Sequence, residues 1–354
     1  MDVVALSTLR NRFVAWWEGY ELDPQPEPDA DETAAEEESA NEDSQPSRFD
    51  LFRERFMAWW EGRECGEETL AEDEERPASQ LGPQAPVKPL ELPPEKKART
   101  VIWTPERIKI AERVWGAGFT SPGGEDYILK LVGPLALKPE RSVLDLGAGL
   151  GGPARAMVGA FGVWVTAMEP SEVLAAQGME ESTRAGMAKK AAVVSYDPES
   201  VELRRKGFDC VFAKETFFTV VNKRRLFGTI AKSLKKDGQL LFTDYLLAKS
   251  DPMRPEIQNW ITYEPVPPEL WSIKQTRECL ENLKFEIRVE EDISDEVSYL
   301  VLKAWRAVLS TLKPGHLRPE LGEALVDEAE MWLHRAAVLA SSEVRVYRIH
   351  AFKR

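Results

Sequence analysis

The spacing of apolar residues along the chain changes at about residue 104. Beyond it, short apolar runs alternate with amphipathic stretches of helical spacing, the first beginning at Pro105 behind the N-cap Thr104. Repeated strand and helix units of this kind predict an α/β fold with a doubly wound, mostly parallel seven-stranded sheet. The strands are expected at residues 143–146, 163–168, 192–196, 208–213, 239–243, 285–289 and 344–350.

A long, mostly helical stretch separates the last two predicted strands. It covers residues 294–340 and is interrupted at 313–316 by Lys-Pro-Gly-His. We expect it to cover the ligand pocket as a lid. Its tryptophans, Trp305 and Trp332, are expected to pack in the core, with an aromatic cage as the alternative.

The first hundred residues have a different composition. Residues 21–47 are rich in Asp, Glu and Pro and contain no Lys or Arg, and residues 64–98 are acidic and then Pro-rich. Such segments bury too little apolar surface to offset the entropy of the chain. The sequence therefore predicts a largely disordered tail at 1–98 and a folded domain at 99–354.

Two short motifs in this tail repeat each other. The segments at about 5–19 and 48–62 match with an offset of 43 residues, and in each the apolar positions fall on one face of a helix. Helices of this length are marginal alone in water, so each needs a surface to bind. Docking to a protein partner is one possibility, docking onto the chain's own domain is a second, and binding to a membrane surface is a third. The predicted anchors are Phe13, Trp16, Trp17, Phe56, Trp59 and Trp60.

A glycine-rich stretch after the first predicted strand is the main candidate for ligand binding. Gly147, Gly149 and Gly152 fit the G-x-G-x-x-G spacing of dinucleotide sites, and Glu169 follows about 20 residues later. The acid two residues before the first glycine, in Asp145-x-Gly147-x-Gly149-x-Gly151, instead resembles class I S-adenosyl-L-methionine (AdoMet) methyltransferases. By that resemblance, Asp145 would bind the methionine ammonium group.

Further carboxylates follow the next two predicted strands. Glu169 is placed to accept hydrogen bonds from ribose hydroxyls, and Asp197 from an adenine amino group beside Tyr196. Since strand ends carry the ligand chemistry of doubly wound folds, acids after three successive strands favour AdoMet over a dinucleotide. Pro170, Ala213 and Lys214 lie at the same predicted edge.

Three segments together resemble the phosphoethanolamine N-methyltransferases. They are residues 112–124, the glycine motif, and the region from Phe208 to Tyr245. The resemblance implies a Rossmann-like class I methyltransferase, an enzyme with AdoMet as cofactor. It also implies that the loop 119–124 closes over the methionine end of the cofactor, which gives binding roles to Ser121, Gly123 and Gly124.

The acceptor side departs from that family. Thr219 stands where the family has a histidine, although the family's acid four positions earlier is present as Glu215. We therefore predict that Glu215, Tyr245 and Tyr263 orient an acceptor or receive its proton. The alternatives for function are methylation of a small molecule at N or O, methylation of a protein, and a non-catalytic adaptor.

Composition limits the remaining possibilities. The net charge of −14 argues against nucleic-acid binding, which needs clustered Lys and Arg. The three cysteines lack CxxC spacing, and the three histidines lack metal-ligand spacing, so neither a disulfide framework nor a metal site is expected. With no signal peptide and no long apolar run, we expect a cytoplasmic protein without integral membrane association.

Overall fold

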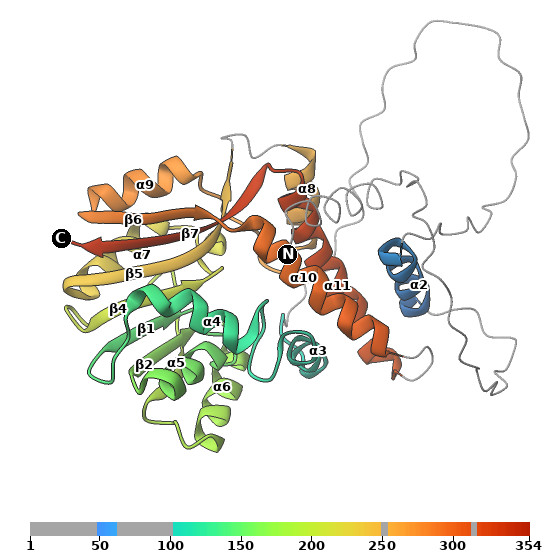
Figure 1. The fold of residues 1–354 in the computed structure, drawn as a ribbon, viewed down its shortest axis with the longest axis horizontal. Helices are drawn as coiled ribbons and strands as arrows, with labels where there is room; N and C mark the ends of the chain where they lie inside the picture. The colour runs from blue at the N-terminus through green and yellow to red at the C-terminus, as the bar shows by residue number, and fades with distance from the viewer. Residues whose placement is uncertain (1–47, 62–101, 249–253, 313–316) are drawn as a thin grey trace, which may run out of the picture.

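A seven-stranded mixed sheet forms the centre of the computed structural model, which describes residues 48–61, 102–248, 254–312 and 317–354 (Figure 1). The strand order is β3-β2-β1-β4-β5-β7-β6. The strands are β1 (Ser142–Leu146), β2 (Trp164–Glu169), β3 (Ala191–Ser195), β4 (Phe208–Lys214), β5 (Leu234–Leu247), β6 (Phe285–Asp292) and β7 (Val344–Lys353). The predicted strands are all present.

One strand runs against the others. β7 pairs antiparallel with both β5 and β6, whereas the pairs from β3 across to β5 are parallel. β1 lies between β2 and β4, so the chain reverses its direction of winding there. This is the switch point at which doubly wound sheets open a crevice beyond the carboxyl ends of their strands.

Helices cover both faces of the sheet because the strands are apolar on both sides. Val143 and Phe212 share one hydrophobic cluster with α4 (Gly124–Val132) and α5 (Gly152–Phe161). Leu144 and Ala213, the neighbours of opposite orientation, pack with α7 (Lys223–Ser233) and α9 (Ile273–Asn282). α6 (Glu172–Arg184) connects β2 to β3.

A separate group of helices lies beside the sheet, toward one end of its strands (Figure 1). It contains α3 (Pro105–Trp115), α8 (Pro255–Tyr263), α10 (Ser294–Thr311) and α11 (Pro319–Ala340). Trp115, Trp305 and Trp332 pack edge to face in its core. The predicted helical insertion is therefore confirmed, and both of its tryptophans are buried.

The second repeat of the tail forms α2 (Arg48–Glu61) and contacts α10 and α11. Phe56 is fully buried in this contact, and Arg53 Nε donates to the Leu309 carbonyl at 3.1 Å. For this repeat the structure shows self-docking, and Phe56 is not presented to a partner as the partner-docking prediction requires. The first repeat and the predicted disordered segments lie outside the described residues.

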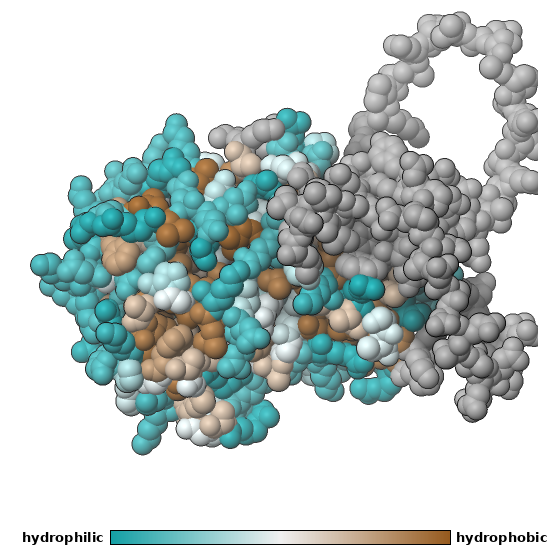
Figure 2. All heavy atoms as spheres, in the orientation of Figure 1, coloured by the Kyte–Doolittle hydropathy of each residue, from teal (hydrophilic) through white to brown (hydrophobic). Residues whose placement is uncertain are grey.

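The length and composition of the described helices bear on whether any of them could cross a membrane. Within the described ranges, none of the helices combines the length and the apolar composition that a membrane crossing requires. The face seen in Figure 2 is mostly hydrophilic where it is described, with hydrophobic residues gathered in limited areas.

Candidate active site

The turn between β1 and α5 brings backbone to the crevice at the switch point. Gly147 has φ of +75°, and a Cβ built there would lie 1.9 Å from Thr216 Oγ1. Gly149 has φ of +55°, and its Cβ would lie 2.6 Å from Thr120 Oγ1. Only glycine satisfies both the left-handed conformation and the lack of space. Both residues line the large cavity described below.

Asp145 lies under this turn and is 1% exposed. Its Oδ2 has no hydrogen-bond partner among the described residues. Burial, assisted by the nearby charge of Glu169, raises its pKa to about 8. An unpartnered carboxylate here fits the ammonium group that the sequence predicts for this position.

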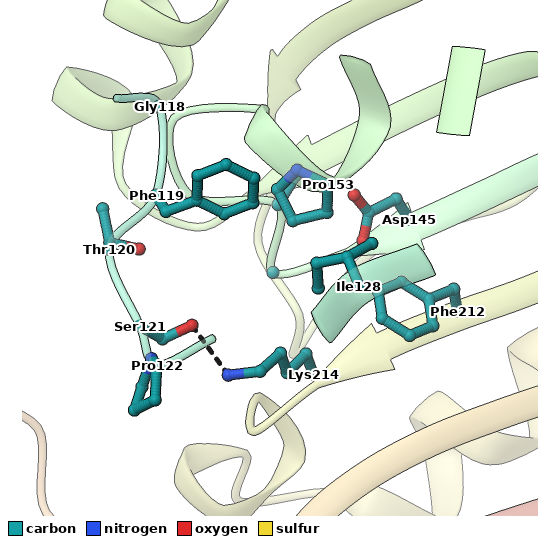
Figure 3. Close-up of a pocket in the computed structure, with 12 residues that line it drawn as sticks. Gly118, Phe119, Thr120, Ser121, Pro122, Ile128, Asp145, Pro153, Phe212 and Lys214 are labelled. Atoms are coloured by element: carbon teal, nitrogen blue, oxygen red, sulfur yellow. Dashed lines mark hydrogen bonds between the residues drawn. The ribbon is translucent and has the colours of Figure 1, made fainter. Parts of the chain in front are cut away.

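The loop before α4 covers Asp145 (Figure 3). Gly118 accepts a hydrogen bond from Gly152 N at 3.0 Å through its carbonyl, which ties the loop to the glycine turn. Lys214 Nζ donates to Ser121 Oγ at 2.9 Å and joins the loop to the end of β4. The loop, the glycine turn and the end of β4 enclose a small cavity of about 20 Å³, and both Asp145 and Ser121 line it. The loop thus lies over Asp145, and its closure over the methionine end of a cofactor stays a prediction.

Glu169 ends β2 at the edge of the larger cavity. Its carboxylate accepts from Gly149 N at 2.8 Å and from Ser171 N at 2.9 Å. Burial raises its pKa, and these two hydrogen bonds partly offset that effect. Each carboxylate oxygen retains a second lone pair, so Glu169 can still accept from ribose hydroxyls.

Most of the other predicted cofactor residues do not line either cavity. Asp197 is exposed and accepts from Ser200 Oγ at 2.6 Å and from Glu199 N at 2.9 Å, which lowers its pKa. Of the predicted cofactor residues not yet described, Pro170 lines the large cavity and the others line neither cavity. The residues outside both walls are Gly123, Gly124, Gly151, Tyr196, Asp197 and Ala213.

The large cavity has a volume of about 510 Å³ and runs from the cofactor edge to the helical group. Thr219, the position of the family's histidine, lines it. Aromatic side chains from three regions, Trp103, Phe218 and Trp332, contribute to its wall. The cavity is large enough for a cofactor and a small acceptor, because ligand pockets are typically about 300–1,000 Å³.

Each cation that lines this cavity has a carboxylate partner. Arg335 forms a two-pronged pair with Glu264, at 2.6 and 2.7 Å. Arg107 pairs with Glu328 at 2.6 Å, and Lys214 pairs with Glu215 at 2.8 Å. Burial alone would lower the pKa of Arg335, but the charge and hydrogen bonds of Glu264 raise it above its usual range. These cations are already neutralised from within the protein.

The Glu264 and Arg335 pair gives a direct test of this arrangement. Replacing Glu264 with Gln leaves a buried guanidinium without a counter-charge, so we expect the free energy of unfolding to fall by about 3–5 kcal/mol in urea titrations. The matched control is Glu290→Gln, which breaks the more exposed pair with Arg277 and is expected to cost at most about 1 kcal/mol. Equal losses in the two variants would show that burial does not strengthen the first pair.

Glu215 is the carboxylate best placed for an acceptor. It follows β4 with φ of +51°, an unfavourable backbone conformation for a residue with a side chain. Its Oε1 accepts from Lys214, while Oε2 is buried without a partner among the described residues. Since the residue lines the cavity, one carboxylate oxygen is available for a proton donor or cation.

The other two acceptor candidates do not line the cavity. Tyr245 is fully buried between Phe218 and Trp260, and burial raises its pKa well above the ordinary value. Tyr263 stacks on His334, with ring centroids 3.5 Å apart. Of the three predicted acceptor residues, Glu215 alone lines the large cavity.

Sequence reasoning missed the charged residues that the helical group contributes to the wall of the large cavity. Glu328 and Arg335 lie on one face of α11 at helical spacing, and Glu264 follows α8 directly. A charged residue on the apolar face of a helix indicates a buried charge, and buried charges are almost always paired. This pattern could have marked these residues as members of buried ion pairs. Nothing in the sequence showed which partner each one takes.

Comparisons with known proteins agree with the fold and the site. Residues 124–288 match the family described as methyltransferase domain. The chain is 28% identical over 197 residues to phosphoethanolamine N-methyltransferase 3 of Arabidopsis thaliana, which covers 56% of this chain and 39% of that protein. It is 32% identical over 147 residues to phosphoethanolamine N-methyltransferase 2 of Caenorhabditis elegans, covering 40% and 33%. The matched region spans well under half of each relative.

A solved structure extends the comparison to the fold. Haemonchus contortus phosphoethanolamine N-methyltransferase 2, in complex with S-adenosyl-L-methionine, superposes with a TM-score of 0.61 at 22% identity. The superposition covers 70% of this chain and 56% of that one. Residues 124–288 therefore match a methyltransferase domain, and the sheet order and the glycine turn are those of the class I methyltransferase fold.

Proposed function

We propose that the protein transfers a methyl group from AdoMet to a small-molecule amine. The observation that carries the cofactor is Asp145, a buried carboxylate with an unpartnered oxygen beneath the glycine turn. Glu169 would hold the ribose, and the loop that includes Ser121 would cover the methionine end. Bound AdoMet would supply a methyl group on a positively charged sulfur.

The protein's part in such a reaction is mainly alignment. Methyl transfer is an in-line displacement, so the rate depends on holding the acceptor's lone pair opposite the leaving sulfur in a site that excludes water. The loop 118–122, held by Lys214, covers one side, and α11 covers the other. Glu215 would hold the acceptor nitrogen and receive the proton that it loses.

The charges of the cavity support an amine and disfavour a phosphate-bearing acceptor. Arg107, Arg335 and Lys214 are each paired with a glutamate, so among the described residues no cation of the wall is left for a phosphate. The unpartnered oxygen of Glu215 and the aromatic side chains favour a cation instead. The pairing of these cations therefore disfavours phosphoethanolamine, the substrate in the names of the relatives, as the acceptor of this chain.

Calorimetry and product analysis test the proposal together. We expect saturable AdoMet binding to the full chain, followed by transfer of a radiolabelled methyl group to an amine with an uncharged aromatic tail, such as phenethylamine, faster than to phosphoethanolamine. Label appearing in protein would favour the protein methyltransferase alternative. Absence of AdoMet binding would favour the adaptor and overturn the proposal.

A protein partner is not part of this proposal. Phe56, one of the anchors predicted for that role, is buried against the chain's own domain. The amine proposal needs only residues of the sheet edge and of the helices around the cavity.

A further inference from the structure

The surface on which α2 lies, formed by α10 and α11, has two possible ligands within one chain. We propose that the first repeat, residues 5–18, binds this same surface in place of α2. The observation behind the proposal is the pattern of agreement between the repeats, compared with the burial of each α2 position.

The apolar positions of α2 that contact the domain are apolar in both repeats. Phe49 and Phe56 are the buried positions, and the first repeat has Leu6 and Phe13 there. Phe52 and Met57 pack against the same hydrophobic cluster, and their equivalents are Leu9 and Val14. Every apolar contact position that the structure describes in α2 is therefore apolar in the first repeat.

The polar contact is also repeated. Arg53 Nε donates to the carbonyl of Leu309, and the first repeat has Arg10 at the equivalent position. Among the α2 positions whose burial is described, the two repeats differ in character at Asp50, Leu51 and Glu54, where the first repeat has Ser7, Thr8 and Asn11. Leu51 and Glu54 are exposed, so these two differences avoid the contact, whereas Asp50 is half-buried.

Chain length does not prevent the exchange. The first repeat precedes the second by 43 residues, which roughly doubles the connection to the domain. Because the entropy of loop closure grows only logarithmically with length, doubling the connection lowers occupancy by about threefold. The second repeat then holds the surface in most molecules, and the first holds it when the second is displaced.

Substitutions of the buried phenylalanine in each repeat test the proposal in the full chain. Phe56→Asp should expel α2 and admit the first repeat, so we expect Tm to fall by about 1–2 °C and the amides of α11 to keep their protection from hydrogen exchange. Phe13→Asp alone should change Tm by less than about 1 °C. The double variant should lose about 5 °C or more, with at least tenfold faster exchange in α11.

The comparison between single and double variants decides the outcome. If Phe56→Asp alone lowers Tm as far as the double variant does, the first repeat does not replace α2 and the proposal fails. A dependence of Tm on protein concentration in the Phe56→Asp variant would place the first repeat on a second copy, which overturns exchange within one chain. Leu51→Asp, at an exposed position of α2, and Thr8→Asp, at the equivalent position of the first repeat, are matched controls and should leave Tm unchanged.

Discussion

Replacing Asp145 with Asn is expected to weaken AdoMet binding by about 100-fold or more while stabilising the unliganded protein. The carboxylate is 1% exposed, and no described residue donates to its Oδ2. In the complex the ligand's ammonium group would supply the missing counter-charge. Removing one member of a buried charge pair typically costs about 2–5 kcal/mol, and each 1.4 kcal/mol is a factor of ten in affinity.

The gain in stability follows from the raised pKa of Asp145. An aspartate with an ordinary pKa of 3.8 when unfolded and about 8 when folded binds more protons in the folded state between these values. Its contribution to stability therefore falls as pH rises from about 4 to 8 and is constant above that range. At pH 7 the penalty is at most about 4 kcal/mol, and we expect Asp145→Asn to recover about 1–3 kcal/mol of it.

A second aspartate provides a control of opposite sign. Burial would raise the pKa of Asp209, but hydrogen bonds from Lys235 and Ser142 outweigh that effect and lower it. Asp209→Asn should therefore destabilise the protein and leave AdoMet affinity unchanged. Urea unfolding across pH 5–9 and calorimetry with AdoMet measure both variants. If Asp145→Asn binds AdoMet as tightly as the parent protein, the ammonium assignment is wrong.

The position of the candidate cofactor residues at one edge of the sheet could be predicted from the sequence because these residues are close together in the chain. Asp145, Gly147 and Gly149 lie within five residues of each other, and each strand end is marked by the apolar run before it. Topology then brings successive strand ends together without any information on pairing. The exception is Asp197, whose exposed carboxylate hydrogen-bonds to the turn that follows it.

The acceptor side could not be predicted in the same way. Glu264 and Arg335 are 71 residues apart, and Arg107 and Glu328 are 221 apart. Such pairs form only when the helical group assembles, and a single sequence does not show which residues pair. Tyr245 illustrates the same limit, because its position after the fifth strand did not show that its ring faces the core.

Replacing Glu215 with Gln is expected to lower kcat by about 100-fold or more, because a positioned proton acceptor contributes about 10²–10⁴ to rate. Glutamine keeps the shape of the side chain but removes the charge that would hold an amine. Stopped assays with the amine identified by product analysis would measure kcat and KM, and calorimetry would measure the Kd for AdoMet.

The same substitution also removes the negative charge that pairs with Lys214, which holds Ser121 and the loop over Asp145. A loss that acts through this loop would weaken AdoMet binding, whereas a loss that acts on the acceptor would leave the AdoMet Kd within about threefold of the parent value, a difference of about 0.7 kcal/mol. Glu215→Asp keeps the charge and is expected to recover part of kcat. An unchanged kcat in Glu215→Gln would show that the acceptor is held elsewhere in the cavity, and a parallel loss in kcat and AdoMet affinity would assign Glu215 to the loop.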